Sequence, residues 1–434
     1  MFGYYLDLAL RSLRRNKALT ALMVLAIAMG IGVSMTTLTV LHVMSGDPVP
    51  GRSELLYYPQ IDPRAGSGYL PGQTDPMDKV SWVDGMNLLR AQRADRQALM
   101  TGGQVAIQRE DATLSAFYEA SRYTTADFFS MFGVQFEYGE AWSAKDDEAS
   151  ARVVVINTEL NNKLFGGRNS VGQTLRLSGV PFRIIGVLRD WHPNPKFYDL
   201  GDRRYEHEGV YVPLSTSQDV GMNHEGSVEC WRDGGAGKNP SHTSSCAWLQ
   251  FWVQLDSSAK AEAYMKFLVA YSEEQKAQGR FERPPNVRLF NVTQWLDYNK
   301  VIPGDVRLQN WLAFGFLLVC LMNAMGLIQA KFRQRTSELG VRRALGASKL
   351  ALFAQLLVES GVVGLAGGLC GLLLAILGLW LVRLQPVEYT ALAHLDFSML
   401  LTTVVLAIVT TLLAGLIPAW RASQIAPALQ LKTQ

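Results

Sequence analysis

Two cysteines in a polar stretch, Cys230 and Cys246, are the residues whose type and spacing most clearly allow chemistry. The segment between them, "WRDGGAGKNPSHTSS", is rich in Gly and Ser residues, which are typical of a loop. Outside the cytoplasm such a pair forms a disulfide, and closing a loop this short contributes about 3 kcal/mol in the chain-entropy model. The alternative is a zinc site that adds His242 and His224, although this spacing matches no common zinc pattern. We therefore predict a disulfide and no bound metal.

The sequence shows no phosphate-binding loop and no catalytic motif of the common types. The loop sequence "GGAGKN" does not satisfy the phosphate-binding pattern G-x-x-x-x-G-K-[ST], because Arg232 and Asn239 occupy two of its required positions. Acids lie near histidines in "DWHPNP" (190–195) and "YEHEG" (205–209), but such clusters are typical of solvated loops. The sequence contains no H-E-x-x-H and no G-x-S-x-G. We expect no catalytic site and no ATP hydrolysis by this chain.

A short basic segment, "RQRTSELGVRRALGASK" (333–349), lies between two long apolar stretches. Ser337 is expected to cap a helix, Glu338 to pair with Arg342 four residues later, and Gly346 to end the helix. Apolar residues among these charges predict a contact surface for a partner. The alternative is a loop that only fixes membrane orientation, for which scattered charge would suffice. The residues assigned to this surface are Ser337, Glu338, Leu339, Gly340, Val341, Arg342, Arg343, Ala344, Leu345 and Gly346.

Four uncharged stretches are long enough to cross a bilayer, whose hydrocarbon core of about 30 Å needs about 20 residues of helix. They predict an α-helical membrane protein with four transmembrane helices and an α+β extracytoplasmic domain inserted between the first two. The predicted divisions are an amphipathic helix at 1–17, transmembrane helices at 18–43, 308–330, 350–382 and 397–420, the inserted domain at 44–306, the basic segment at 331–349 and a tail at 421–434.

The basic residues predict the orientation of the chain. They gather before the first apolar stretch, between the second and third, and after the fourth. The positive-inside rule then places both termini and segment 331–349 in the cytoplasm and the inserted domain outside. The formal net charge of +3 is too small to indicate nucleic-acid binding, so we expect membrane lipids rather than nucleic acid as partners.

The third apolar stretch is rich in small residues at four-residue spacing, which lets helix backbones approach closely. We predict close helix packing there, either within the chain or across a dimer. Glu359, at the start of the uncharged part, is interpreted as an end residue that reaches the interface, with an intramembrane partner for an arginine as the alternative. The residues assigned to helix packing are Ser360, Gly364, Gly367, Gly368 and Gly371.

The inserted domain shows alternating strand and helix signals. The β-branched run "ARVVVI" predicts a strand at 151–156, followed by a helix that Asn157 caps and Gly166 ends. Two alternating runs joined at Ser178 and Gly179 predict a hairpin. Pro, Gly and Ser residues predict loops or poorly ordered segments in two regions. Further strands are expected at 208–213 and 247–255, helices at 81–94 and 258–277, and loops at 46–76 and 215–246.

The predicted topology consists of one span, a large external domain and three further spans. It resembles that of the FtsX-like permeases, the MacB-like membrane subunits of ABC transporters. Residues 338–348 satisfy the signature E-[LIV]-G-[LIV]-[RK]-[RK]-A-[LIV]-G-A-[ST] of this family throughout. The stretch that begins "YTTADFFSMFGVQFEYGEAWS" and runs to "VPFRIIGVL" resembles the MacB-type periplasmic core domain. The ending "PAWRASQIAPALQL" is also similar to the family's end.

The resemblance implies a permease that relays ATP-driven movement through the bacterial inner membrane to periplasmic domains. ATP and Mg²⁺ would be bound by a partner ATPase, which contacts the segment around Glu338. Because the sequence starts almost directly at its first span, we expect that ATPase to be a separate polypeptide. The resemblance also implies a second permease, either a copy of this chain or a related one, a periplasmic adaptor and an outer-membrane duct. The alternatives are an FtsX-type signalling protein that regulates a periplasmic cell-wall hydrolase, and a lipoprotein-releasing permease.

Overall fold

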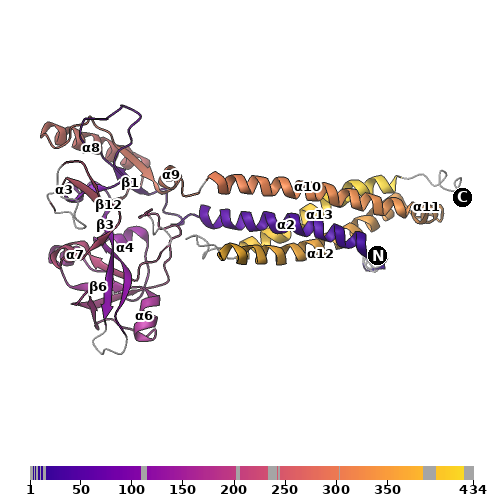
Figure 1. The fold of residues 1–434 in the computed structure, drawn as a ribbon, viewed down its shortest axis with the longest axis horizontal. Helices are drawn as coiled ribbons and strands as arrows, with labels where there is room; N and C mark the ends of the chain where they lie inside the picture. The colour runs from indigo at the N-terminus through magenta and orange to yellow at the C-terminus, as the bar shows by residue number, and fades with distance from the viewer. Residues whose placement is uncertain are drawn as a thin grey trace. The chain divides into compact units, whose positions relative to one another are not determined.

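The computed structural model describes residues 3, 5, 8, 9, 11, 12, 16–108, 115–201, 206–232, 242, 245–302, 304–384 and 397–424. The chain divides into two compact units, drawn in Figure 1. One unit comprises Met1–Ser45 and Ile302–Gln434, and the other comprises Gly46–Val301. The predicted helix at 1–17 and the predicted tail at 421–434 lie largely outside the described residues and stay predictions.

Among its described residues, the first unit contains four helices that are long and apolar enough to cross a membrane, as predicted. In this unit α2 packs against α10 and α12, and α12 packs against α13 (Figure 1). Small and aliphatic side chains such as Ile27, Leu317 and Ala414 form the buried core of the bundle. The helices whose bounds the structure describes in this unit are α2 (Lys17–Ser45), α10 (Gly304–Gln334), α11 (Thr336–Ala344), α12 (Lys349–Arg383) and α13 (Phe397–Ser423).

The helix α12 is longer than a bilayer requires. Its 35 residues span about 50 Å at 1.5 Å per residue, against a hydrocarbon core of about 30 Å. Ser348 caps its first turn by accepting a hydrogen bond from the backbone N–H of Ala351 at 3.1 Å. The first turns of α12, near α11, can therefore lie outside the hydrocarbon core, where polar and charged side chains cost less to place.

The second unit is an α+β domain built on one mixed sheet of 13 strands among the described residues. Its main path runs in the order β13-β1-β12-β3-β4-β9-β6-β8-β5, with short strands β2, β7, β10 and β11 pairing at the side. The strands are β1 (Leu56–Gln60), β2 (Val80–Ser81), β3 (Arg96–Gln108), β4 (Phe117–Thr124), β5 (Phe136–Gly139), β6 (Val153–Ile156), β7 (Thr174–Leu177), β8 (Val180–Leu188), β9 (Val210–Pro213), β10 (His224–Glu225), β11 (Glu229–Cys230), β12 (Cys246–Gln254) and β13 (Arg288–Asn291).

Helices contribute to the hydrophobic core on each face of this sheet. Strand β6 shows the division, because Val154 and Ile156 enter one cluster while Val153 and Val155 enter the other. Successive side chains of a strand point to opposite faces, so a strand buried on both faces is apolar throughout. The helices are α3 (Trp82–Ala91), α4 (Asp127–Phe132), α5 (Ala144–Glu148), α6 (Thr158–Phe165), α7 (Leu214–Asp219), α8 (Ser258–Ala277) and α9 (Val292–Tyr298).

Local sequence signals in this domain are confirmed where a cap or a turn determined them. Asn157 accepts a hydrogen bond from the N–H of Leu160 at 2.7 Å, and Gly166 ends α6 with a φ of 64°. Ser178 and Gly179, with φ of 48° and 88°, form the turn between β7 and β8. The expectation of loops across 46–76 and 215–246 is wrong in part. Strand β1 lies in the first region, and most of α7 with β10 and β11 lies in the second.

Candidate functional site

Helix α11 occupies the basic segment between the second and third spans. It begins at Thr336, with Arg335 at the N-cap position and no side-chain cap. The prediction that Ser337 caps this helix is therefore wrong, because Ser337 lies one residue inside the first turn. The predicted end is confirmed, since Gly346 follows the helix with a φ of 100°, a left-handed conformation that favours glycine.

Ion pairs within α11 and a hydrogen bond to α12 hold the charged side chains of this helix. Glu338 lies 3.0 Å from Arg342, the predicted pair, and 3.1 Å from Arg335 at the helix start. Arg342 also donates to the side chain of Gln355 on α12 at 3.0 Å. Each of these pairs is partly exposed, so each alone contributes about 1 kcal/mol or less. The bond from Arg342 to Gln355 ties the rotation of α11 about its own axis to α12.

That rotation separates the apolar residues of α11 into two groups. Leu339 is 4% exposed and belongs to the core of the bundle, so its assignment to a partner surface is wrong. Val341 is 56% exposed and Leu345 is 83% exposed, and Leu350 at the start of α12 is exposed as well. Ser337 and Ala344 are exposed, while Gly340 and Arg343 are half-buried. We name Val341, Leu345 and Leu350 the exposed apolar face.

Glu359 is buried, and the interpretation of this residue as an end residue that reaches the interface is wrong. Its side chain lies 2.8 Å from Lys331 near the end of α10 and 3.1 Å from Arg335. Ser12, from the segment that precedes α2, donates a hydrogen bond to the same carboxylate. The sequence offered the alternative of an arginine partner, and the structure supplies both an arginine and a lysine.

The small residues of α12 pack against helices of the same chain. A Cβ at Gly364 would lie 1.7 Å from the hydroxyl of Thr411 on α13, and one at Gly368 would lie 2.6 Å from Ala407. Two further glycines face α2. A Cβ at Gly367 would lie within 3.0 Å of Ile27, and one at Gly371 would lie within 3.0 Å of Ile31. Ser360 in turn meets Gly415 of α13. The structure thus places these residues at contacts within the chain, one of the two possibilities left open by the sequence.

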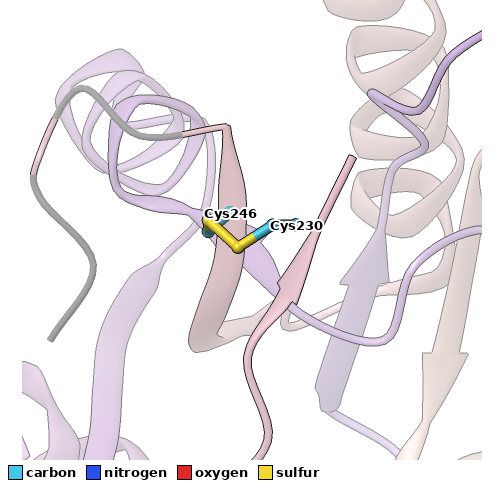
Figure 2. Close-up of a disulfide and its surroundings, with 2 residues drawn as sticks. All are labelled: Cys230 and Cys246. Atoms are coloured by element: carbon cyan, nitrogen blue, oxygen red, sulfur yellow. A yellow bond between two sulfur atoms is a disulfide. The ribbon is translucent and has the colours of Figure 1, made fainter. Parts of the chain in front are cut away.

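Cys230 and Cys246 form a disulfide, as predicted (Figure 2). The two cysteines face each other on the antiparallel strands β11 and β12. His224 and His242 do not join them, because their rings stack on Trp248 and Trp82. Within the part of the chain that the structure describes, no group of three or more His, Cys, Asp or Glu residues could hold a metal ion.

Replacing Cys230 and Cys246 together by serine should lower the stability of the external domain by about 2 kcal/mol. The loop between them then regains conformational freedom in the unfolded state. This loss of stability is at the low end of the range for removal of a native disulfide, because β12 keeps its pairing with β3. Hydrogen exchange of the β11–β12 peptides in the full chain measures the effect. Wild-type protein treated with reductant should match the variant, and equal protection before and after reduction would contradict the assignment.

A buried ionic cluster in the external domain carries no motif in the sequence. Arg122 on β4 is fully buried and pairs with Glu208 and with Asp199, the latter at 2.8 Å. Lys196 and Tyr198 donate to Glu208 at 3.1 and 3.0 Å. This cluster lines a cavity of about 720 Å³. Since these residues come from three separate segments of the chain, no local spacing in the sequence could have indicated them.

The charges in this cluster determine its titration. Burial alone would raise the pKa of Glu208, but the charges of Arg122 and Lys196 outweigh burial and hold that pKa below its ordinary value. The pKa of Asp199 is lowered for the same reason, against the effect of its burial. Both carboxylates are therefore charged near neutral pH, and the cluster is a set of compensated charges rather than a proton donor.

The histidines of "DWHPNP" and "YEHEG", expected in solvated loops, come together in the structure. The rings of His192 and His207 lie 4.1 Å apart, and His192 Nε2 lies 2.5 Å from Asp190. Burial and the neighbouring His192 lower the pKa of His207. Both histidines lie in loops, as expected, but their rings are half-buried rather than fully exposed to solvent.

Comparison with protein families gives two matches that together cover most of the chain. Residues 20–270 match the family described as "MacB-like periplasmic core domain". Residues 310–427 match the family described as "FtsX-like permease C-terminal". The second match includes α11, the exposed apolar face and Glu359, and the first includes the disulfide and the buried cluster of the external domain.

Individual relatives are distant. The chain is 24% identical over 377 residues to the pyoverdine export ATP-binding/permease protein PvdT of Pseudomonas aeruginosa, with 85% of this chain and 50% of that protein covered. It is 22% identical over 304 residues to the uncharacterized ABC transporter permease YvrN of Bacillus subtilis, with 69% of this chain and 67% of that protein covered. The periplasmic region of MacB from Actinobacillus actinomycetemcomitans superimposes with a TM-score of 0.37 and 17% identity, covering 59% of this chain and 97% of that one.

Proposed function

The chain belongs to the family defined by the MacB-like periplasmic core domain, here combined with an FtsX-like permease region, and on that premise we propose that it is the permease subunit of an ABC exporter. In this role the membrane helices carry movement, powered by ATP hydrolysis on another subunit, to the external domain. Four apolar helices and a periplasmic-type domain fit a protein of the inner membrane.

The observation that carries this proposal is the exposed apolar face of α11. Val341 and Leu345 are exposed at a helix that a hydrogen bond from Arg342 to Gln355 ties to α12 and that Leu339 anchors in the bundle core. Large apolar side chains exposed on an ordered polar helix are typical of a contact surface for another protein. A pure orientation loop would not require them, because orientation depends on the basic residues alone.

ATP and Mg²⁺ are proposed to be bound by a separate ATPase subunit. The 434 residues contain no G-x-x-x-x-G-K-[ST] sequence, which is the loop that cradles the phosphates in such enzymes. PvdT is named an ATP-binding/permease protein, and this chain matches half of its length. YvrN, by contrast, is named a permease.

The orientation follows from the basic residues of α10, α11 and the start of α12. On this basis we propose that the α11 end of the bundle, together with both termini, lies in the cytoplasm, and that unit Gly46–Val301 lies in the periplasm. The disulfide between Cys230 and Cys246 supports this side, since such bonds persist in oxidising compartments.

Export is proposed rather than signalling or lipoprotein release, because the names of PvdT and of other similar proteins refer to export. A second permease, either a copy of this chain or a related one, would complete the membrane part. A periplasmic adaptor and an outer-membrane duct are proposed on the family resemblance alone.

Replacing Val341 and Leu345 together by glutamate should weaken binding of the ATPase at least about tenfold, which corresponds to about 1.4 kcal/mol. Two new charges would have to be desolvated in an apolar contact. The measurement is the Mg²⁺-dependent ATP hydrolysis that co-purifies with the tagged chain from the membranes of its own cells.

Leu70→Glu, a change of an exposed leucine in the external domain, is the matched control and should leave the co-purified activity unchanged. Leu339 is not part of the test, because it is buried in the bundle. Wild-type levels of ATPase in the Val341→Glu/Leu345→Glu preparation would refute α11 as the contact.

A further inference from the structure

A compact group of polar and charged side chains joins α10, α11, α12 and the segment before α2 at the α11 end of the membrane bundle. Lys331 and Glu359 are each 2% exposed and Ser12 is 6% exposed. Arg335, between α10 and α11, contacts both Glu359 and Glu338 at 3.1 Å. We name Ser12, Lys331, Arg335 and Glu359 the ionic node.

The node connects four segments through one carboxylate. Glu359 on α12 forms ion pairs with Lys331 on α10 and with Arg335 at the start of α11. It also accepts a hydrogen bond from Ser12, in the segment before α2. Arg335 also donates to Ser12 at 2.8 Å, which closes the set of contacts. Other links between α11 and the bundle include Leu339 in the core and the bond from Arg342 to Gln355.

The charge of Glu359 is required where it lies. Lys331 Nζ stands 2.8 Å from the Glu359 carboxylate but in a direction that does not make a hydrogen bond, so this contact depends on charge rather than alignment. Two cations converge on this single carboxylate, and Arg335 has Glu338 as a second partner. Removing the carboxylate would leave Lys331 buried without a counter-charge, which is far more costly than removing an exposed ion pair.

Such a geometry suits the transmission of force. Movement of α11 relative to the bundle would have to separate Arg335 from Glu359, and breaking a buried pair is unfavourable. A displacement of α11 is therefore passed to α10 and α12 together instead of being absorbed at the connections on either side of α11. Those connections are short, since α10 ends at Gln334 and α12 begins at Lys349.

We propose that Glu359 is a positioning residue, which holds α11 at a fixed angle to α10 and α12 through Arg335 and Lys331. The role of that angle in transmitting movement rests on the proposed function. The angle itself belongs to this chain alone, and it can be measured without any ATPase present.

The test uses pulsed electron spin resonance on the full chain in lipid nanodiscs. Spin labels at Leu345→Cys and Trp420→Cys, two exposed positions, report the distance between α11 and the end of α13. Cys320 and Cys370 are replaced by alanine so that only the two introduced cysteines react. The wild-type node should give a narrow distance distribution, and Glu359→Gln should broaden it at least twofold.

Glu359→Asp, which keeps the charge, should restore most of the narrow distribution. Lys349→Gln removes an exposed charge from the start of α12 and is the matched control, with the wild-type distribution expected. The pair Lys331→Met/Glu359→Leu replaces the buried charges by apolar groups of similar size, a change that buried sites often tolerate. It should fold and still show the broad distribution.

A wild-type distribution in Glu359→Gln or in the apolar pair would overturn the assignment. So would failure of both to fold, since the residue would then serve folding rather than position. Absence of a co-purifying ATPase would instead remove the proposed function and leave the distance result unaffected, so the two failures can be told apart.

Discussion

Replacing Arg122 by methionine should destabilise the external domain by about 3–5 kcal/mol near neutral pH. The change leaves Glu208 and Asp199 buried with only part of their compensating charge, and breaking a buried pair on one side carries a cost of this size. The measurement is the free energy of local opening at β4 and β9, obtained from hydrogen exchange in the full chain. Arg176→Met, at an exposed position on β7, should change that free energy by no more than about 0.5 kcal/mol.

The pH dependence of this loss gives an independent check. In the wild type the pKa values of Glu208 and Asp199 are lowered on folding, so their contribution to stability is present above about pH 4 and is lost as the pH falls through the folded values. In Arg122→Met the carboxylates of Glu208 and Asp199 lose their main cation. Protonation of these carboxylates removes the cost of burying their negative charge. The difference between wild type and variant should therefore shrink as the pH approaches 4. A difference that stays constant down to pH 4 would show that packing, not charge, causes it.

Replacing Gly364 by valine should lower the stability of the membrane bundle by about 3 kcal/mol. A Cβ at this position would lie 1.7 Å from the Thr411 hydroxyl, which itself donates to the backbone of Ala407. Because Thr411 and Ala407 stand on α13, the only relief is to separate α12 from α13. Thermal unfolding of the solubilised chain, followed through the far-ultraviolet circular dichroism of the helices, measures the effect.

Gly361→Val is the matched control, since it introduces the same residue one turn earlier on α12. A Cβ at Gly361 meets nothing within 4 Å. The control should retain the wild-type melting temperature within about 2 °C, because only helix propensity changes. Equal losses at Gly361 and Gly364 would mean that the small residues of α12 do not set its distance from α13.

Predictions from sequence succeeded where a local rule determines structure. The caps of α6, the turn at Ser178 and Gly179, and the four apolar stretches all depend on residues within a few positions of one another. The interior of β3 escaped prediction because its "TGGQ" centre combines glycine with polar residues. Gly103 is needed there, since a Cβ would lie 2.4 Å from the ring of Tyr123 on the paired strand β4.

The position of helix α11 could be predicted from the sequence, but not the directions of its side chains. The order of residues in α11 indicated a contact helix, yet Leu339 and Val341 are equally apolar in sequence. Which of them faces the bundle depends on the pairing of Arg342 with Gln355 on another helix. Glu359 was misassigned for a related reason, because its partners come from residues 24 to 347 positions away along the chain. Long-range pairing of this kind leaves no local pattern.

The most direct test of the central claim is hydrogen exchange of the external domain, residues 46–301, in the full chain with its co-purified ATPase. Exchange is compared between the nucleotide-free complex and the complex held with a non-hydrolysable ATP analogue. We predict that peptides of the external domain change their exchange on nucleotide binding, and that Val341→Glu/Leu345→Glu abolishes the change while Leu70→Glu preserves it. Identical exchange with and without the analogue in the wild-type complex would contradict a permease that relays the ATPase cycle across the membrane.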